Sequence, residues 1–150
     1  MSKVILDASA LLAYFNSEKG GDVVEELLSS SIMSTVNIAE VIAERMHKLG
    51  VKICVLTDGP KGSYVYDGAK YYFLEIYDGP VVERTGCGDA FGAAFTAARV
   101  YDLSVEEAMR WGTFNSAYVI RMPGPQNGLL DKQEMLSLLK DNKDFKPKEI

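Results

Sequence analysis

Short apolar segments alternate with amphipathic segments along this chain, and this alternation limits the possible folds more than any other feature. Residues 3–7 and 31–35 are predicted to be short strands, and residues 51–57 form a continuous apolar run, as buried strands do. Between them lie segments of helical character: 10–15, 22–30 and 37–49. Such alternation predicts β-α-β units with right-handed crossovers, so the three strands are expected to be parallel neighbours.

The second half of the chain combines a hairpin with three helices. Residues 63–66 and 70–76 are two short apolar runs joined by a turn at Asp67-Gly68. Helices are predicted over 88–101, from Ser104 towards Arg121 and from Asp131 onward. Together the segments predict a three-layer α/β/α sandwich. Its sheet is expected to be mostly parallel and Rossmann-like, with a small antiparallel hairpin, and residues 1–150 are expected to form a single domain.

The predicted helix over 37–49 has a specific pattern and a specific end. Its apolar stripe recurs at steps of three and four residues and consists of Ile38, Val41, Ile42, Met46 and Leu49. Gly50 follows at the position where helices end on a left-handed residue. A positive φ is therefore expected at Gly50.

Composition excludes several classes of protein. The 150 residues carry a formal net charge of −5, which opposes non-specific nucleic-acid binding, so RNA is not expected as a partner. The sequence has no apolar run of the roughly 18 residues needed to cross a bilayer. The two cysteines, Cys54 and Cys87, provide neither a disulfide framework nor a metal-ligand spacing. A cytoplasmic location is expected, without a membrane partner.

A glycine-rich turn precedes the helix predicted from residue 88. The segment Thr85-Gly86-Cys87-Gly88-Asp89-Ala90-Phe91 allows the backbone to turn tightly and to approach a ligand. The unpaired N–H groups of the helix start form an anion site, and Asp89 is placed to accept a proton from an attacking hydroxyl. The alternative is that Asp89 is only a favourable acid in a first helical turn and that the glycines only form a tight loop.

Residues 51–130 resemble the C-terminal part of the PfkB/ribokinase family of sugar and nucleoside kinases. The resemblance is carried by the segments 55–63, 83–91 and 115–117 and by the hairpin. It implies that Asp89 is the catalytic base and that the amides of Gly86, Cys87 and Gly88 form the anion hole. It also implies that Thr57, Gly59 and Gly62 lie along the nucleotide and that Asn115 through Gly124 border the adenine. Glu83 departs from the aspartate common at its position, and the family's sugar pocket and lid are not recognisable in residues 1–50.

Two acids near the N-terminus suggest different chemistry. Asp7 ends the first predicted strand and Glu40 lies in the helix over 37–49, so both carboxylates could bind Mg²⁺ or Mn²⁺ at one sheet edge. Alternatively, Asp7 caps the following helix and Glu40 fits a capping position three residues after Asn37. Residues 3–49 resemble the start of a PIN-domain ribonuclease of the toxin type, through the segments 4–15 and 34–41. That resemblance implies a metal-dependent ribonuclease whose later acids are missing here.

The two resemblances meet at Gly50, which predicts a recombined or engineered chimera of a PIN-like segment, 1–50, and a PfkB-like segment, 51–150. Such a chain is expected to lack efficient catalysis and to require no cofactor. It is expected to retain weak binding of phosphate or ATP, with Mg²⁺. The alternatives are an ATP-dependent PfkB-type carbohydrate kinase remnant and a Mg²⁺-dependent PIN-type ribonuclease. Aromatic residues of the hairpin that lack cover predict a homodimer.

Overall fold

The computed structural model describes residues 4–150. These divide into two compact units, residues 4–54 and residues 55–150. Lys3, the first residue of the first predicted strand, lies outside the described residues. The two units are described separately. Whether they unfold as one cooperative domain stays a prediction. In the described part of the chain, no helix is long and apolar enough to cross a membrane.

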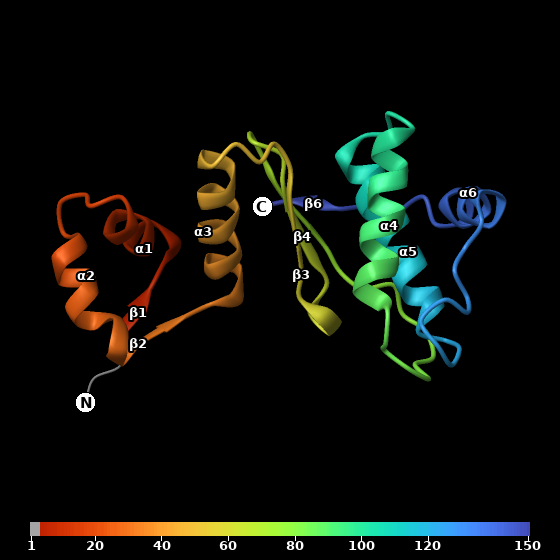
Figure 1. Ribbon diagram of the computed structural model, residues 1–150, viewed down its shortest axis with the longest axis horizontal. Helices are drawn as coiled ribbons and strands as arrows, with labels where there is room; N and C mark the ends of the chain where they lie inside the picture. The colour runs from red at the N-terminus through yellow and green to blue at the C-terminus, as the bar shows by residue number, and fades with distance from the viewer. Residues whose placement is uncertain (1–3) are drawn as a thin grey trace. The chain divides into compact units, whose positions relative to one another are not determined.

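The first unit is built on two short parallel strands. Strand β1 (Val4–Leu6) pairs with β2 (Ser31–Met33), with Ile5 opposite Ile32. The parallel pairing of these two segments, predicted from the sequence, is confirmed. Helix α1 (Ala8–Phe15) follows β1 and packs against α2 (Gly21–Leu27) and α3 (Thr35–Lys48); a 3-10 turn, η1 (Leu28–Ser30), leads into β2. Figure 1 shows α1 and α2 side by side in this unit.

Helix α3 ends as its sequence predicts but begins two residues before the predicted Asn37, so Asn37 and Glu40 do not cap it. Ser34 caps its first turn by accepting a hydrogen bond from Asn37 N–H at 3.2 Å. At the other end Gly50 has a φ of 101°, and its N–H donates to His47 C=O at 2.8 Å. The positive φ predicted for Gly50 is confirmed.

The sequence pattern predicted the wrong buried side chains for α3. Of its five residues only Val41 is buried, whereas Leu49 is 81% exposed. The residues that α3 buries besides Val41 are Ala39 and Ala43. Small side chains allow two helix backbones to approach closely, so alanine rather than isoleucine lies at the contacts that α3 makes.

Replacing Gly50 with alanine should lower the free energy of unfolding by about 1 kcal/mol, because a left-handed conformation strains a residue that has a Cβ atom. An added Cβ meets no atom within 4 Å, so strain at φ is the expected cause. Chemical denaturation of both proteins measures the difference. A neutral result would mean that the helix end relaxes into another conformation at no cost.

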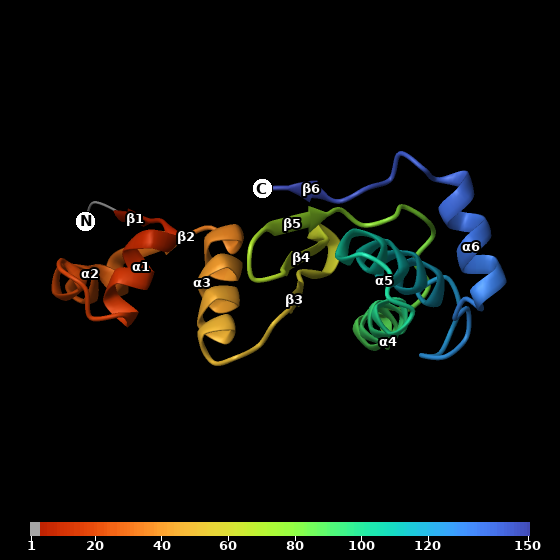
Figure 2. The same cartoon turned by 90° about the horizontal axis from the view of Figure 1, so that it is seen from above.

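The second unit holds a four-stranded sheet with the order β3-β4-β5-β6. These strands are β3 (Cys54–Thr57), β4 (Ser63–Tyr66), β5 (Tyr71–Leu74) and β6 (Lys148–Glu149). Strand β5 runs antiparallel to both β4 and β6, and Figure 2 shows β6 alongside β5. The hairpin predicted at 63–76 is therefore confirmed, and β6 extends it.

The predicted three-layer sandwich is not confirmed, because the strands fall into two separate sheets. Strand β3 is not the neighbour of β1 and β2 that the alternating pattern predicted. The turn of residues 58–62, which contains the 3-10 helix η2 (Gly59–Lys61), joins β3 directly to β4. A strand that continues through a short turn readily pairs with the next strand, and β3 does so here. What holds is an α/β fold with parallel pairing in one sheet and antiparallel pairing in the other.

Alternation along the hairpin separates a core face from an aromatic face. Val65, Tyr72 and Leu74 are buried, and α5 packs on these two strands. The side chains of the opposite face pair across the strands, with ring centroids 5.0 Å apart for Tyr64–Phe73 and 4.3 Å for Tyr66–Tyr71. These four rings are half-buried rather than fully exposed. The homodimer expected from uncovered aromatic residues stays a prediction.

Helices α4 (Cys87–Val100) and α5 (Val105–Val119) lie side by side in this unit (Figure 1), and α6 (Lys132–Asp141) packs on α5. The predicted caps are present: Ser104 accepts from Glu107 N–H, and Asp131 and Glu134 form a reciprocal capping box. Helix α5 is the most buried helix of this unit, and Phe114 and Met109 have no exposed surface.

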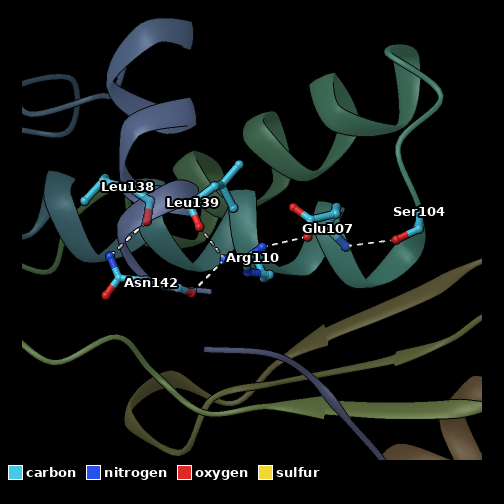
Figure 3. Close-up of polar contacts among 6 residues, drawn as sticks. All are labelled: Ser104, Glu107, Arg110, Leu138, Leu139 and Asn142. Atoms are coloured by element: carbon cyan, nitrogen blue, oxygen red, sulfur yellow. Dashed lines mark hydrogen bonds and ion pairs between the residues drawn. The ribbon is translucent and has the colours of Figure 1, made fainter. Parts of the chain in front are cut away.

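Arg110 of α5 forms hydrogen bonds to the C-terminal end of α6 (Figure 3). Its side chain is 5% exposed and its guanidinium donates to Leu139 C=O at 3.1 Å and to Asn142 C=O at 2.8 Å. The same group pairs with Glu107 at 2.6 Å. A cation thus satisfies carbonyls at the C-terminal end of α6, where the helix dipole favours positive charge.

Replacing Arg110 with alanine should lower the free energy of unfolding by about 2–3 kcal/mol, because the substitution leaves the Leu139 and Asn142 carbonyls without their charged donor; the partner Glu107, with a side chain 38% exposed, can be solvated. Arg110→Lys should recover only part of the loss, since an ammonium lacks the planar fork. Denaturant melts measure both, with the exposed Lys146→Ala as the control. Equal stabilities for Arg110→Ala and the control would contradict this role.

Candidate nucleotide and anion site

The glycine turn before α4 has the geometry of an anion site. Gly86 has a φ of 82°, and a Cβ there would lie 2.6 Å from Pro125 Cβ, so both conformation and space require glycine. The first intrahelical bond of α4 runs from Ala90 N–H to Gly86 C=O at 2.8 Å. The amides of Gly88 and Asp89 precede that bond, at the positive end of the helix dipole.

The backbone at this helix start is open to solvent. Gly88 is exposed, and a Cβ built on it meets no atom within 4 Å. Asp89 is also exposed, as the third residue of α4. A ligand can therefore approach the backbone of this helix start, where the N–H groups of Gly88 and Asp89 precede the first intrahelical bond.

A second glycine turn connects β3 to β4. Asp58 N–H donates to Gly62 C=O at 2.8 Å, and both Gly59 and Gly62 have positive φ, 51° and 114°. A Cβ on Gly62 would overlap Leu74 O, so the turn lies directly against the end of β5. Thr57, the last residue of β3, directly precedes this turn.

Both glycine turns line one cavity of about 170 Å³. Five of the residues predicted to bind nucleotide or anion line it: Thr57, Gly59, Gly62, Cys87 and Gly88. Sequence reasoning missed the walls, which come from residues 75–81 and from Thr113, Ser116 and Ile120 of α5 and its end. In the sequence, the α5 residues that line the cavity could be recognised only as small residues, such as Thr113 and Ser116, at helical spacing. The same spacing is found where helices simply pack together.

Three of the predicted nucleotide or anion residues, Gly86, Asn115 and Gly124, do not line the cavity, and neither does the predicted base Asp89. Asn115 and Gly124 have structural contacts instead. Asn115 is buried; its Nδ2 donates to Ala90 C=O at 2.8 Å and its Oδ1 accepts from Leu130 N–H at 2.9 Å. It therefore links α5 to α4 and to the loop before α6. Gly124 donates its N–H to Glu83 Oε2 at 2.8 Å and has a φ of 90°.

Hydrogen bonds hold residues 77–84 against the end of α5. Ile120 C=O accepts hydrogen bonds from Val82 N–H at 2.8 Å and from Glu83 N–H at 3.2 Å. Arg121 donates to Asp78 C=O at 3.3 Å while its guanidinium lies 3.9 Å from the Tyr118 ring centroid. These contacts hold this irregular segment against the end of α5.

Glu83 should make the stability of this region depend on pH. Hydrogen bonds from Gly124 N–H and the Thr85 side chain hold the pKa of its carboxyl below the ordinary 4.5. Because the folded-state pKa is lowered, the stabilisation is fully present above the unfolded pKa and is lost as pH falls through the folded pKa. The stability difference between the unsubstituted chain and Glu83→Gln should therefore shrink below about pH 4.5. Urea melts between pH 7 and pH 3 measure it, with the exposed Glu26→Gln as control, and a difference independent of pH would contradict it.

The two N-terminal acids, predicted to bind metal, lie in the first unit without further acidic partners. Asp7 accepts hydrogen bonds from Ala10 N–H and Ser9 Oγ, both at 2.9 Å, which lower the pKa of its carboxyl. Asp7 is thus the cap of α1, the alternative weighed from the sequence. Glu40 is half-buried within α3. Among residues 4–150 no group of three or more His, Cys, Asp or Glu side chains is arranged to hold a metal ion.

Comparisons with known proteins agree with the α/β fold and with the resemblance to carbohydrate kinases. The model of the pfkB family of carbohydrate kinases matches residues 21–133. The ribokinase of Arabidopsis thaliana is 35% identical over 105 residues, which are 69% of this chain and 27% of the ribokinase. The cytidine kinase of Thermococcus kodakarensis is 37% identical over 84 residues, 55% of this chain and 30% of that enzyme.

A solved structure of Arabidopsis thaliana ribokinase, complexed with ribose and ATP, superimposes with a TM-score of 0.64 at 33% identity. The match covers 71% of this chain and 35% of that one. The fold is therefore a ribokinase-like α/β fold. The chain belongs to the pfkB family of carbohydrate kinases. It spans less than half the length of these relatives.

The family match corrects the chimera interpretation. The match begins at residue 21 and passes through the predicted junction at Gly50, so α2, β2 and α3 fall within the kinase family model. The comparisons give no support to a PIN-domain segment over residues 1–50 or to a chimeric origin. The PIN-like pattern consisted of an acid at a strand end and an acid in a helix. The first feature also arises from helix capping in any α/β protein, as Asp7 illustrates, and the second from an acid within a helix, as Glu40 is in α3.

Proposed function

We propose that the chain provides the ATP-binding part of a pfkB-type carbohydrate kinase, with Asp89 as the base for phosphoryl transfer. The observation that carries the proposal is the shared cavity. Two glycine turns about 30 residues apart in sequence, together with α5, line one space of about 170 Å³. A cavity with apolar walls and a few polar groups is typical of a small-molecule site.

The start of α4 is the part of the site suited to the phosphates. The Gly88 and Asp89 amides point from the positive end of a 14-residue helix, and Gly88 has no side chain to keep an anion away. Arg84, which also lines the cavity, adds positive charge next to the turn. ATP enters kinase sites with Mg²⁺, which is held mainly by phosphate oxygens and water, so an acidic cluster is not needed to bring the metal.

Asp89 is suited to accept a proton. The carboxylate lies in the first turn of α4, exposed and next to the amides that would stabilise negative charge on the transferred group. During transfer, the hydroxyl oxygen of the sugar forms a bond to the γ-phosphorus, the bond from that phosphorus to ADP breaks, and the hydroxyl proton passes to Asp89. This step requires a sugar held in line, because phosphoryl transfer depends mostly on positioning and charge stabilisation.

Calorimetric titration tests the binding part of this proposal. Mg²⁺-ATP is titrated into the full chain beside a titration with Mg²⁺ alone, and weak heat of binding is expected only with the nucleotide. Gly88→Val should weaken ATP binding by about tenfold or more, because it places a branched side chain where a phosphate would approach. The control is Gly92→Ala, on the exposed side of the same helix. No ATP binding, or equal binding by Gly88→Val, would overturn the assignment.

A further inference from the structure

The segment between β5 and the glycine turn, residues 75–84, forms neither helix nor strand, although seven of its ten residues line the cavity. Its middle part is open to solvent: Val81 is 50% exposed and Val82 is 60% exposed. Irregular, exposed backbone keeps one position only where specific contacts hold it. The contacts of this segment therefore decide whether one wall of the cavity is in place.

Arg121, the second residue after α5, holds the middle of this segment. Its guanidinium donates to Asp78 C=O at 3.3 Å, and its Nε donates to Ala117 C=O at 3.2 Å. The guanidinium carbon lies 3.9 Å from the centroid of the Tyr118 ring. Arg121 is thus fixed to α5 and bonded to the segment, while it does not itself line the cavity.

Gly79 lets the segment approach Arg121 closely. A Cβ built on Gly79 would lie 2.5 Å from Arg121 Nη2, well inside contact distance. Gly79 is not among the glycines with positive φ, so its backbone conformation would accept a side chain and only the space is restricted. Two residues more than 40 positions apart in the sequence therefore fit each other at one contact.

We propose that Arg121 is a positioning residue for the nucleotide, because it holds residues 77–81 against the end of α5 and so keeps this wall in place before the ligand arrives. The inference rests on the proposed ATP binding and adds a residue that acts without touching the ligand. Affinity falls in proportion to the fraction of molecules in which the binding site is formed.

Arg121→Ala should weaken ATP binding by about tenfold in calorimetric titrations with Mg²⁺, which corresponds to a wall in place in about one molecule in ten. Affinity for inorganic tripolyphosphate should change by less than about twofold, because the amides at the start of α4 do not depend on Arg121. A role in overall folding, or in attracting negative charge, would weaken both ligands. Arg99→Ala is the matched control, because Arg99 at the end of α4 also donates to a carbonyl, that of Leu103, and does not line the cavity.

Gly79→Ala tests the same contact from the other side. The added methyl displaces the Arg121 guanidinium, so ATP affinity should fall by a similar factor. Combining Gly79→Ala with Arg121→Ala should cause no further loss, because residues that act through one contact are not additive.

Each outcome decides a specific point. Unchanged ATP affinity in Arg121→Ala, with binding by the unsubstituted chain, overturns the positioning role and leaves the proposed function standing. An equal loss for ATP and tripolyphosphate, or a further loss in the double variant, also overturns the role. If Arg121→Ala does not fold, Gly79→Ala decides, and unchanged ATP affinity in that variant overturns the role. Failure of the unsubstituted chain to bind either ligand would overturn the proposed function and this inference together.

Discussion

Replacing Asp89 with asparagine is expected to lower phosphoryl transfer from ATP to a sugar hydroxyl by about 10²–10⁴-fold, the range typical of a lost general base. Asparagine keeps the shape of the side chain and cannot take up the hydroxyl proton. The carboxylate is exposed in the first turn of α4, so the substitution leaves no buried group without a partner.

The measurement is ADP release by the full chain with ATP, Mg²⁺ and a panel of sugars and nucleosides. ATP affinity should change by less than about threefold, because the amides of the helix start remain in place. Glu106→Gln, an acid in the first turn of α5, is the matched control. If the unsubstituted chain shows no transfer with any acceptor, the catalytic part of the proposal fails and only nucleotide binding remains. Equal rates for Asp89→Asn and the unsubstituted chain would contradict the role of Asp89 directly.

Replacing Gly62 with alanine is expected to lower the free energy of unfolding by about 3 kcal/mol or more, because the backbone there occupies a region that is essentially restricted to glycine. Its φ is 114° and its ψ is −150°. An added Cβ would also overlap Leu74 O and lie 3.0 Å from Glu75 Cα, and backbone atoms of a paired strand cannot move aside easily. Relief of the overlap requires the turn to separate from the end of β5, which would also displace one wall of the cavity.

Gly88→Ala is the matched control for stability. It introduces the same methyl group into a helix start where no atom lies within 4 Å, so its effect on unfolding should be within about 0.5 kcal/mol. Denaturant melts of the two variants measure the contrast, and ATP titrations show whether binding falls with Gly62→Ala. Similar stabilities for Gly62→Ala and Gly88→Ala would mean that the turn tolerates a side chain and that the geometry assigned to Gly62 is wrong.

Local features of the sequence predicted local features of the structure. The cap at Ser104, the capping box of Asp131 and Glu134, the left-handed Gly50 and the hairpin turn at Asp67-Gly68 depend on residues within a few positions of one another. The same holds for the glycine turn before α4, whose shape is encoded by its own residues. The kinase resemblance was recognisable for this reason, since its motifs are short and contiguous.

The PIN resemblance was misleading for the same reason that the local predictions succeeded. A carboxylate after a short strand and another in a helix satisfy a nuclease pattern, although Asp7 is a helix cap and Glu40 lies within α3. Asp7 uses its carboxylate for Ala10 N–H and Ser9 Oγ. The family match, which extends from residue 21 to residue 133, was decisive because it tests a long ordered set of positions rather than two acids.

The sequence by itself determined the α/β class, the helix ends and turns, and the glycine motifs, because short-range sterics and hydrogen bonds specify them. Only the tertiary structure decided that β3 pairs with β4 rather than with β1, that α3 buries alanines rather than isoleucines, and that Gly59 and Gly88 line the same cavity. Each of these depends on the free-energy balance among distant segments that compete for the same partner surface. That balance is set by packing across the whole unit and not by the pattern within any one segment.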